Sequence, residues 1–316
     1  MDTTNLSSIF HPSSPEAHSI YDLTFGVVIL CAVIFTLVLG LIAYACVKFR
    51  AKPNSPEPKQ EHGNTWLETL WTATPFLTLV VVMVFTIRTM IAVSPSTTAG
   101  KPDLIVVGHQ WWWEVRYPMA DGSEAVTANE IHIPVGKKLL LELRAADVIH
   151  DFWVPDLGRK IDAIPGQPNQ IWLEADHKGT FLGFCAEFCG GSHAWMQLRV
   201  MADDEQDYKT WLTRQATPAL IPQSASAKRG LELFRNNTCV SCHQITGISA
   251  AIQIGPDLSH LGARETLVAG ALQNNPADIA RWLINPDRVK PGAHMPKFGF
   301  RKDELDDLSS FLESLK

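Results

Sequence analysis

The chain has 316 residues, 46% of them hydrophobic and 19% charged, which is enough for two or three domains. Its 27 basic and 33 acidic residues give a net charge of −6, which argues against nucleic-acid binding because such proteins carry a basic field. Six cysteines are too few for a disulfide scaffold, and ten tryptophans with fourteen phenylalanines exclude a disordered chain.

Two uncharged runs near the N-terminus predict a transmembrane hairpin, 21–92, after an N-terminal arm, 1–20. The first run, 23–47, exceeds the roughly 20 residues that a helix needs to cross a bilayer. The second, 69–87, contains Pro75, which neighbouring helices can accommodate. A cleaved signal peptide fits poorly, because the first run lacks a basic segment before it and is too long.

The basic residues predict how this hairpin is oriented. No lysine or arginine precedes Lys48, whereas Lys48, Arg50, Lys52 and Lys59 crowd the loop between the two runs. Because such residues mark the cytoplasmic side, we expect the arm and everything after about residue 93 to lie outside. The expected location is a bacterial inner membrane, with the later domains on the periplasmic side.

Glu68 stands at the start of the second run, beside Trp66 and Trp71, which are typical interfacial anchors. One interpretation is a solvated carboxylate at the end of a helix. The other is a group that admits protons at the mouth of a membrane channel. The residues alone leave both open.

A β-rich domain is predicted over 101–215, followed by a Pro-, Ala- and Ser-rich linker, 216–227. Short β-prone runs separated by turn residues favour an antiparallel sandwich or barrel. The expected strands are 104–107, 111–117, 130–135, 139–143, 170–173 and 181–184.

The last unit, 228–316, is predicted to be a small helical domain. Helical patterns cover 227–234 before the cysteines, 276–284, and the final segment, 302–316. In that final segment, leucines recur at three- and four-residue intervals and form one apolar stripe, which is typical of a packing helix.

The motif Cys239-Val240-Ser241-Cys242-His243 indicates covalent haem attachment. Two thiols at this spacing can form thioethers, and the adjacent imidazole can bind the iron. A redox pair or half of a zinc site is the alternative, but no second cysteine pair follows. Met295 is the only methionine after the motif and is the expected second axial ligand, ahead of His260 and His294.

A second cluster of donor residues lies in one glycine-containing loop. Cys185, Cys189, His193 and Met196 fall within twelve residues, and His150 can add an imidazole from a neighbouring loop. Thiolate, imidazole and thioether donors suit copper rather than magnesium or calcium. A disulfide between the two cysteines is the alternative, which the added histidine and methionine make less attractive.

The runs DVIHDFWVPDLGRKIDAIPGQPNQ and CAEFCGGSHAWM closely resemble subunit II of haem–copper cytochrome c oxidases, over about residues 20–215. The resemblance implies an all-β cupredoxin-like sandwich that holds a binuclear CuA copper centre. The added C-x-x-C-H domain resembles class I cytochromes c, which are all-α, and implies the caa3-type variant. In that variant a cytochrome c is fused to subunit II.

The resemblance also implies a role for each copper-loop residue. Cys185 and Cys189 would bridge two coppers, and Glu187 would contribute its backbone carbonyl. The Glu187 carboxylate would help to hold magnesium or manganese at the subunit I interface. The implied copper ligands are His150, Cys185, Glu187, Cys189, His193 and Met196.

Four further sites are interpreted through the resemblance. GHQWWWEVRY matches an aromatic segment in which Trp111 would accept electrons from cytochrome c, although adjacent tryptophans on a strand cannot all face one way. Glu68 aligns with a glutamate at a proton-channel mouth. Pro256 would lie on the histidine side of the haem, and Arg264 would pair either with a haem propionate or with solvent. Cys31 and Cys46 match no ligand and are expected to be packing residues.

We therefore expect the electron-accepting subunit of a proton-pumping cytochrome c oxidase, passing electrons from haem c to CuA and on to haem a of subunit I. Subunits I and III, a cytochrome c or upstream respiratory complex, and membrane lipid are the expected partners. The alternatives are a CuA-bearing subunit of a nitric oxide reductase, a copper-free quinol oxidase subunit and a periplasmic copper-handling protein.

Overall fold

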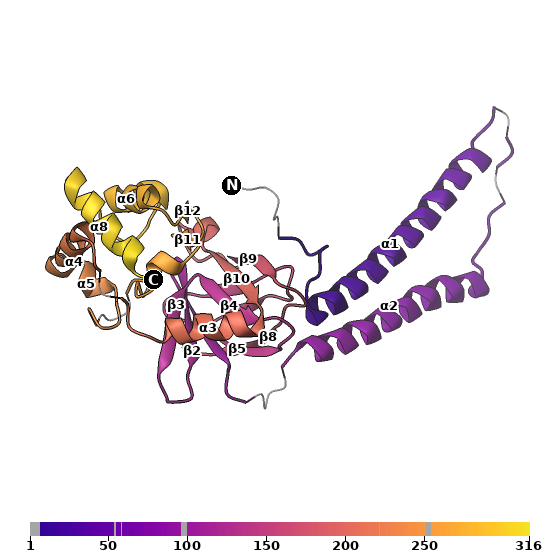
Figure 1. The fold of residues 1–316 in the computed structure, drawn as a ribbon. Coiled ribbons are helices and arrows are strands. Elements are labelled where there is room, and N and C mark those ends of the chain that lie inside the picture. The colour runs from indigo at the N-terminus through magenta and orange to yellow at the C-terminus, as the bar shows by residue number, and fades with distance from the viewer. Residues whose placement is uncertain (1–6, 54, 58, 96–99, 221, 251–253) are drawn as a thin grey trace. The chain divides into compact units, whose positions relative to one another are not determined.

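The computed structural model describes residues 7–53, 55–57, 59–95, 100–220, 222–250 and 254–316 (Figure 1). The chain forms two compact units. One is His18–Ser94, and the other joins Met1–Ala17 to Pro95–Lys316. Of the predicted N-terminal arm, residues 1–6 lie outside the described part.

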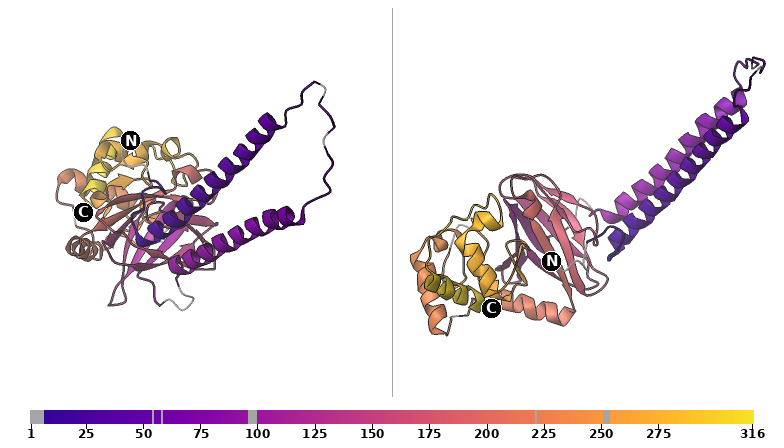
Figure 2. Two further views of the ribbon diagram at one scale, coloured as in Figure 1. Left: turned by 90° about the vertical axis from the view of Figure 1, so that its right-hand side faces the viewer. Right: turned by 90° about the horizontal axis from the view of Figure 1, so that it is seen from above.

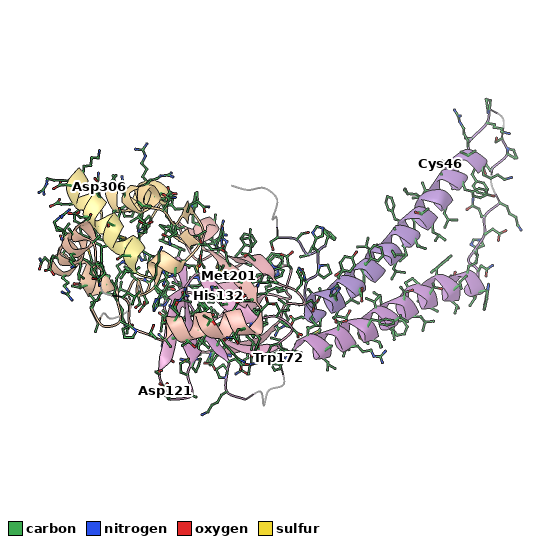
Figure 3. The ribbon with its side chains drawn as sticks, in the orientation of Figure 1. Cys46, Asp121, His132, Trp172, Met201 and Asp306 are labelled. Carbon is green, nitrogen blue, oxygen red and sulfur yellow. The ribbon has the colours of Figure 1, made fainter. Side chains whose placement is uncertain are left out.

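The unit His18–Ser94 consists of two long helices, α1 (Pro15–Lys48) and α2 (Thr65–Val93). Both are long and apolar enough to cross a membrane, and most of their large apolar side chains are exposed. Such exposure is expected of helices whose solvent is lipid. Both helices extend beyond the predicted runs, and the Asn64 side chain caps α2 by accepting the N–H groups of Trp66 and Leu67. Cys31 and Cys46 of α1 are both exposed, and Figure 3 labels Cys46 near the end of this helix.

The β domain is a sandwich of two five-stranded sheets, in the orders β3-β2-β1-β5-β8 and β4-β10-β9-β6-β7 (Figures 1 and 2). The strands of the first sheet are β1 (Leu104–His109), β2 (Trp112–Pro118), β3 (Glu124–Ala128), β5 (Leu139–Ala145) and β8 (Asn169–Leu173). Those of the second are β4 (Glu130–Pro134), β6 (His150–Trp153), β7 (Ile161–Ala163), β9 (Gly179–Cys185) and β10 (Gln197–Asp203).

The sandwich is mostly antiparallel, as expected, but two of its strand pairs are parallel. β1 runs parallel to β5, and β10 runs parallel to β4, while the remaining pairs of the sandwich are antiparallel. The register β10 to β4 sets Met201 opposite His132, both labelled in Figure 3. The parallel pairs arise because the chain crosses from one sheet to the other between β1 and β5, so those two strands cannot be joined by a hairpin.

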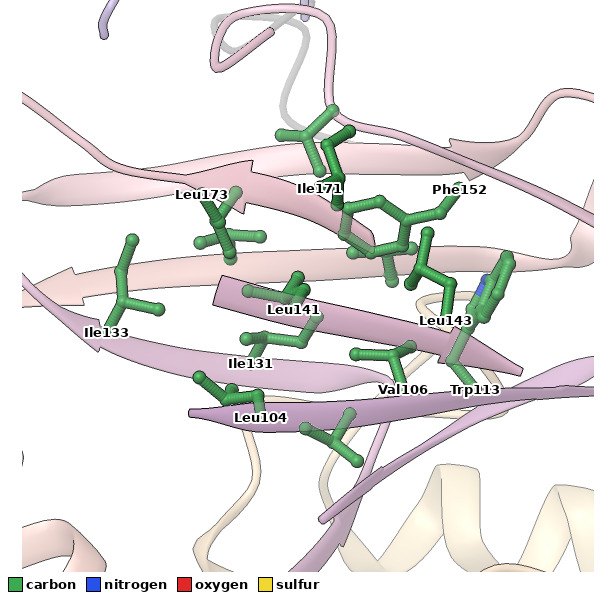
Figure 4. Close-up of a cluster of buried hydrophobic side chains, with 14 of the residues drawn as sticks. Leu104, Val106, Trp113, Ile131, Ile133, Leu141, Leu143, Phe152, Ile171 and Leu173 are labelled. Atoms are coloured by element: carbon green, nitrogen blue, oxygen red, sulfur yellow. The ribbon is translucent and has the colours of Figure 1, made fainter. Parts of the chain in front are cut away.

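The sandwich core closes between the two sheets (Figure 4). Leu104, Val106, Trp113, Leu141 and Phe152 are among its almost completely buried side chains. At roughly 25 cal/mol for each square ångström of apolar surface buried, this core supplies the main stabilisation of the domain. It uses protein atoms from both sheets and forms the base on which the loops after β5, β6 and β9 are held.

The last domain is helical, with α4 (Ala225–Asn236), α6 (Pro276–Ile284) and α8 (Lys302–Ser314) as its main elements. Shorter elements are α5 (Cys239–Cys242), α7 (Pro286–Val289), β11 (Thr266–Leu267) and β12 (Leu272–Gln273). α4 packs closely on α8, because a Cβ added to Gly230 would lie 2.1 Å from the Asp307 carbonyl oxygen. The predicted leucine stripe of α8 is buried, as expected.

The fold class expected from the sequence is confirmed: two apolar helices, a cupredoxin-like β-sandwich and a helical cytochrome c domain. Elements that the sequence patterns missed include β3, β6, β7, β10 and α3 (Glu205–Gln215), and the short elements α5, α7, β11 and β12. β6 illustrates the reason, since it is only four residues long and begins with His150 and Asp151. Polar residues at buried strand positions hide the apolar alternation on which strand prediction depends.

Candidate copper and haem centres

The copper-loop residues are brought together by two neighbouring strands and the turn after one of them. His150 begins β6, and Cys185 ends β9, which pairs with β6 so that Phe152 lies opposite Cys185. The chain then passes through Cys189 and the short helix η1 (His193–Trp195) before β10 begins. Antiparallel pairing therefore converts residues 35 positions apart into neighbours.

Soft donors in this loop contact one another directly. The Sγ atoms of Cys185 and Cys189 are 3.7 Å apart, and Cys185 Sγ lies 3.8 Å from His150 Nδ1. Cys189 Sγ lies 3.5 Å from His193 Nδ1 and 3.8 Å from Met196 Sδ. Cys185 Sγ also lies 3.2 Å from the carbonyl oxygen of Glu187. All six predicted copper ligands thus belong to one connected cluster.

The cluster is not a disulfide. Both cysteines are free and buried, and their 3.7 Å separation exceeds the 2.03–2.05 Å of a sulfur–sulfur bond. The ligand atoms of His150, Cys185 and Cys189 lie within 4.8 Å of one another. Thiolates, imidazoles and a thioether at such spacing suit a soft metal such as copper. The contact with Cys189 lowers the pKa of the Cys185 thiol despite its burial, which favours a thiolate.

Asp147 also belongs to this site, although no motif in the sequence indicates it. Its Oδ1 lies 2.8 Å from His150 Nε2, which leaves His150 Nδ1 facing Cys185. Burial raises the pKa of Asp147, but bonds from His150 and from the N–H groups of Gln110 and Val148 outweigh it, and the pKa is lowered. The carboxylate therefore stays ionised and orients the imidazole, as carboxylates that bond the second ring nitrogen of a metal-binding histidine commonly do.

Trp111 lies against the copper loop rather than on a strand. It precedes β2, and its Nε1 donates a hydrogen bond to the Cys189 carbonyl at 3.1 Å. Gln110 Nε2 donates to the same carbonyl at 2.7 Å. All three adjacent tryptophans are buried, and Trp113 is the one at the centre of the sandwich core. The expectation that at least one is a core residue agrees with this placement.

The histidine of the C-x-x-C-H motif is prepared for iron on one side. His243 Nδ1 lies 2.8 Å from the Pro256 carbonyl oxygen, so its Nε2 is the nitrogen left to bind a metal. A Cβ added to Gly255 would lie 2.5 Å from Cε1 of this ring, which shows how closely the backbone confines it. Burial lowers the pKa of His243, which favours the neutral imidazole that a metal requires.

The other candidate haem residues have different surroundings. Met295 and Cys239 both pack against the core of the haem domain. His260 Nε2 lies 3.0 Å from the Thr217 carbonyl, and the His294 ring lies 5.0 Å from that of Trp111. Arg264 Nη2 donates to the Asp257 carbonyl at 2.5 Å, whereas its Nε is buried with no partner among the described residues. A haem carboxylate would satisfy that atom.

The two remaining candidates are exposed. Glu187 lies at the protein surface, where its Oε1 accepts the N–H of Phe188 at 3.2 Å. Its carboxylate is therefore accessible from outside the chain. Glu68 lies in the exposed first turn of α2, where the helix dipole favours a negative charge. Within its own unit, Glu68 has the surroundings of a solvated carboxylate.

Comparison with known proteins accounts for all three parts of the chain. Family models for the transmembrane and periplasmic domains of cytochrome c oxidase subunit II match residues 4–89 and 103–202, and a cytochrome c model matches 227–316. Cytochrome c oxidase subunit 2 of Alkalihalophilus pseudofirmus is 37% identical, over 99% of this chain and 91% of the relative. The chain belongs to the cytochrome c oxidase subunit II family.

Other similar proteins carry the same family name. Cytochrome c oxidase subunit 2 of Bacillus subtilis is 32% identical to this subunit II, over 98% of this chain and 92% of the relative. A crystal structure of the periplasmic domain of subunit II from Bradyrhizobium japonicum is 34% identical, with a TM-score of 0.33, and covers 36% of this chain and 94% of that one. This subunit II is thus a component of an oxidoreductase that transfers electrons, and its matched domains imply copper and haem c as cofactors.

Proposed function

We propose that this subunit accepts electrons at a covalent haem c and passes them through a binuclear CuA centre to haem a in subunit I. The observation that carries the proposal is the connected cluster of two thiols, two imidazoles and a thioether in the copper loop. Thiolates shared by two coppers spread one electron over both metals, so the centre can change oxidation state with little movement of its ligands.

For the copper centre, the chain's own residues hold and orient the donors. Cys185 and Cys189 would bridge the coppers, with His150 and His193 as terminal ligands, and with Met196 and the Glu187 carbonyl as weak ones. Asp147 supports this assignment because it fixes the orientation of the His150 ring. Burial of both cysteines excludes water and other thiols from the site.

For the haem centre, Cys239 and Cys242 would form the thioethers, and His243 and Met295 would bind the iron. The His243–Pro256 hydrogen bond supports the first axial ligand, and the packing of Met295 against the core of the haem domain supports the second. Trp111, between this domain and Cys189, is the proposed relay between the two centres. The predicted domain boundaries, 21–92, 101–215, 216–227 and 228–316, are part of this proposal.

Subunit I is the partner that this role requires, and we place it at the exposed apolar residues around the copper loop. Val148, Ile149 and Phe188 are 37%, 45% and 75% exposed, and an apolar surface of this kind is typical of an interface. The Glu187 carboxylate would share magnesium or manganese with subunit I there. Glu68 would lie at a proton-channel mouth on the cytoplasmic side, with the haem and copper domains outside.

The proposal extends to proton pumping and to partners beyond subunit I. Subunit III and a cytochrome c or upstream respiratory complex as donor complete the proposed enzyme. A nitric oxide reductase would use the same relay with another catalytic subunit, and the proton-channel role proposed for Glu68 would favour the oxidase. Co-purification with the full complex and measurement of oxygen consumption distinguish the two.

Electron paramagnetic resonance of the full chain, loaded with copper, tests the copper proposal. We expect the seven-line signal of a mixed-valence pair, which Cys189→Ala should abolish because it removes a bridging thiolate. Trp195→Phe, which changes a non-ligand in the same loop, should keep the signal. A four-line mononuclear signal from the unmodified chain would contradict a binuclear centre.

The optical spectrum of the ferric haem tests the second axial ligand. We expect Met295→Ala to remove the methionine-to-iron charge-transfer band, because no other methionine follows the haem motif. His294→Ala is the matched control, since it alters the neighbouring residue without removing a thioether. An unchanged band in Met295→Ala would show that another residue binds the iron.

A further inference from the structure

Glu130 is a buried carboxylate that the proposed relay does not use. It is the first residue of β4 in the β domain and is 3% exposed. Three hydrogen bonds to its two carboxylate oxygens come from the haem domain. Thr266 donates its backbone N–H at 2.9 Å and its hydroxyl at 3.1 Å, and the N–H of Glu265 donates at 3.1 Å.

This contact has the features of a built anchor rather than a chance approach. A buried carboxylate is costly unless donors replace its hydration, and here both oxygens have donors. The N–H groups belong to the start of β11, a two-residue strand whose ladder cannot satisfy all its groups. Arg199 of the β domain lies 3.7 Å from the Glu265 carboxylate and adds an ion pair beside the anchor. Hydrogen bonds to an ionised acceptor are the strong ones.

A second contact between the same two domains lies at the copper loop. Lys290 is 5% exposed and donates its amine to the Trp111 carbonyl oxygen. Ser192, next to His193, donates its hydroxyl to the Pro291 carbonyl. The His294 ring lies 5.0 Å from the Trp111 ring at an angle of 50°. The segment just before Met295 thus lies against Trp111, the residue that bonds the Cys189 carbonyl.

We propose that Glu130 is a positioning residue that anchors the haem domain to the β domain and so keeps the segment 290–294 against Trp111. The Lys290 contact is a single hydrogen bond to a carbonyl oxygen, whereas the Glu130 carboxylate accepts three hydrogen bonds from the haem domain. Two separate contacts between the domains restrict their relative rotation more than one contact can.

The anchor gives the electron relay a fixed geometry, an inference that rests on the proposed function. With both groups bound, the haem would supply one electron and the copper pair would take it up, with no bond made or broken in this chain. Trp111 is 8% exposed, and its ring lies 5.0 Å from that of His294 in the haem domain. An external donor would then have to deliver its electron to the haem, since the surface of Trp111 is occupied by the chain's own segment.

Hydrogen exchange of the full chain tests the anchor without any enzyme activity. Glu130→Gln keeps the side-chain shape but removes the charge and one acceptor oxygen. We expect exchange at the amides of Glu265 and Thr266 to rise by about 10-fold or more, because a hydrogen bond to a charged group is worth at least that factor. Glu142→Gln on β5, whose carboxylate bonds Arg144, is the matched control and should leave both amides unchanged.

A second variant protects the test against misfolding. Thr266→Val removes the hydroxyl that donates to Glu130 and keeps the backbone N–H and the volume. It should give a smaller rise in exchange at the same two amides. If exchange at both amides is unchanged in folded Glu130→Gln and Thr266→Val, the anchor is refuted.

Time-resolved electron transfer from reduced haem to the copper pair tests the positioning role. In Glu130→Gln we expect slower transfer with unchanged haem and copper spectra, and in Glu142→Gln the rate of the unmodified chain. Faster amide exchange without slower transfer would show a purely structural contact. Missing copper or haem signals in the unmodified chain would instead refute the proposed function, and the exchange result would still decide the anchor.

Discussion

The copper loop and the haem segment prepare their donor atoms to different extents. In the copper loop the donors already contact one another, with Cys189 Sγ 3.5 Å from His193 Nδ1 and 3.8 Å from Met196 Sδ. In the haem segment each candidate ligand is held by its own surroundings, His243 by the Pro256 carbonyl and Met295 by the domain core. The copper donors are positioned by a sheet, whereas the haem donors lie on short or irregular segments.

This difference teaches how each domain obtains its core. The β-sandwich closes over Leu141, Phe152 and Trp113 with protein atoms alone, and the copper loop is an addition at one end. In the haem domain, Cys239, Met295 and Phe300 are only partly buried around the core. A haem placed among them would bury their remaining apolar surface. The haem is therefore expected to form part of the core of its domain, whereas the core of the β-sandwich is expected to be complete without copper.

Removal of each group is the strongest test of this contrast. In the double variant Cys239→Ser with Cys242→Ser, covalent haem is lost, and we expect the haem domain to be largely unfolded because part of its core is missing. Removal of copper by a chelator should leave the sandwich folded, because its core does not include the metal. Protease sensitivity of 228–316 and 101–215, mapped in the full chain, measures both.

The matched control for the double variant is Cys31→Ser with Cys46→Ser. These cysteines lie on α1 and are exposed, so their replacement should alter neither domain. A haem domain that resists protease without haem would show that its core is complete, and the contrast between the regions would be lost. The contrast would also be lost if the β-sandwich unfolded when copper was removed.

The sequence predicted the two centres better than it predicted what supports them. Cys185, Cys189, His193 and Met196 could be found because they fall in one short loop, and the C-x-x-C-H motif is local in the same way. Asp147 was missed although it lies three residues before His150, because a carboxylate at that spacing has many other uses. Its role depends on the His150 ring orientation, which only the fold sets.

Glu130 was beyond prediction for a different reason. Its donors, Glu265 and Thr266, lie more than 130 positions away in another domain. No periodicity or motif connects them, since the contact exists only after both domains have folded. β6 and β7 could not be predicted either. These strands are short, contain polar residues, and are stabilised by neighbours in the sheet rather than by their own sequence.

The next largest loss of stability is expected when the close packing of α4 on α8 in the haem domain is disturbed. A Cβ at Gly230 of α4 would lie 2.1 Å from the Asp307 carbonyl oxygen of α8, so Gly230→Ala must push the helices apart. We expect a loss of about 1–3 kcal/mol in the free energy of unfolding, typical of an overpacked contact. Thermal unfolding followed at the haem absorption band measures it.

Lys228→Ala on the exposed face of α4 is the control for Gly230→Ala and should change stability by less than about 0.5 kcal/mol. If Gly230→Ala is as stable as this control, α4 and α8 are free to separate. The contact between α4 and α8 would then be packed less tightly than the core of the β-sandwich, even with haem bound. That outcome would sharpen the contrast rather than remove it.

The smallest loss of stability is expected for substitutions of Asn129, a residue of the β-sandwich whose backbone conformation is unusual for a residue other than glycine. Its φ is 62°, and its Oδ1 accepts the N–H of Trp113 at 2.9 Å. Asn129→Ala should lower the free energy of unfolding by about 1–2 kcal/mol, since it loses that bond and keeps a Cβ at positive φ. Asn129→Gly, which tolerates the backbone angle, should lose less, and the difference isolates the cost of the angle. Urea unfolding followed by tryptophan fluorescence measures both. Because these terms involve only the β domain, copper removal should leave the difference between the two variants unchanged; a difference that depends on copper would mean that the metal takes part in holding the sandwich together.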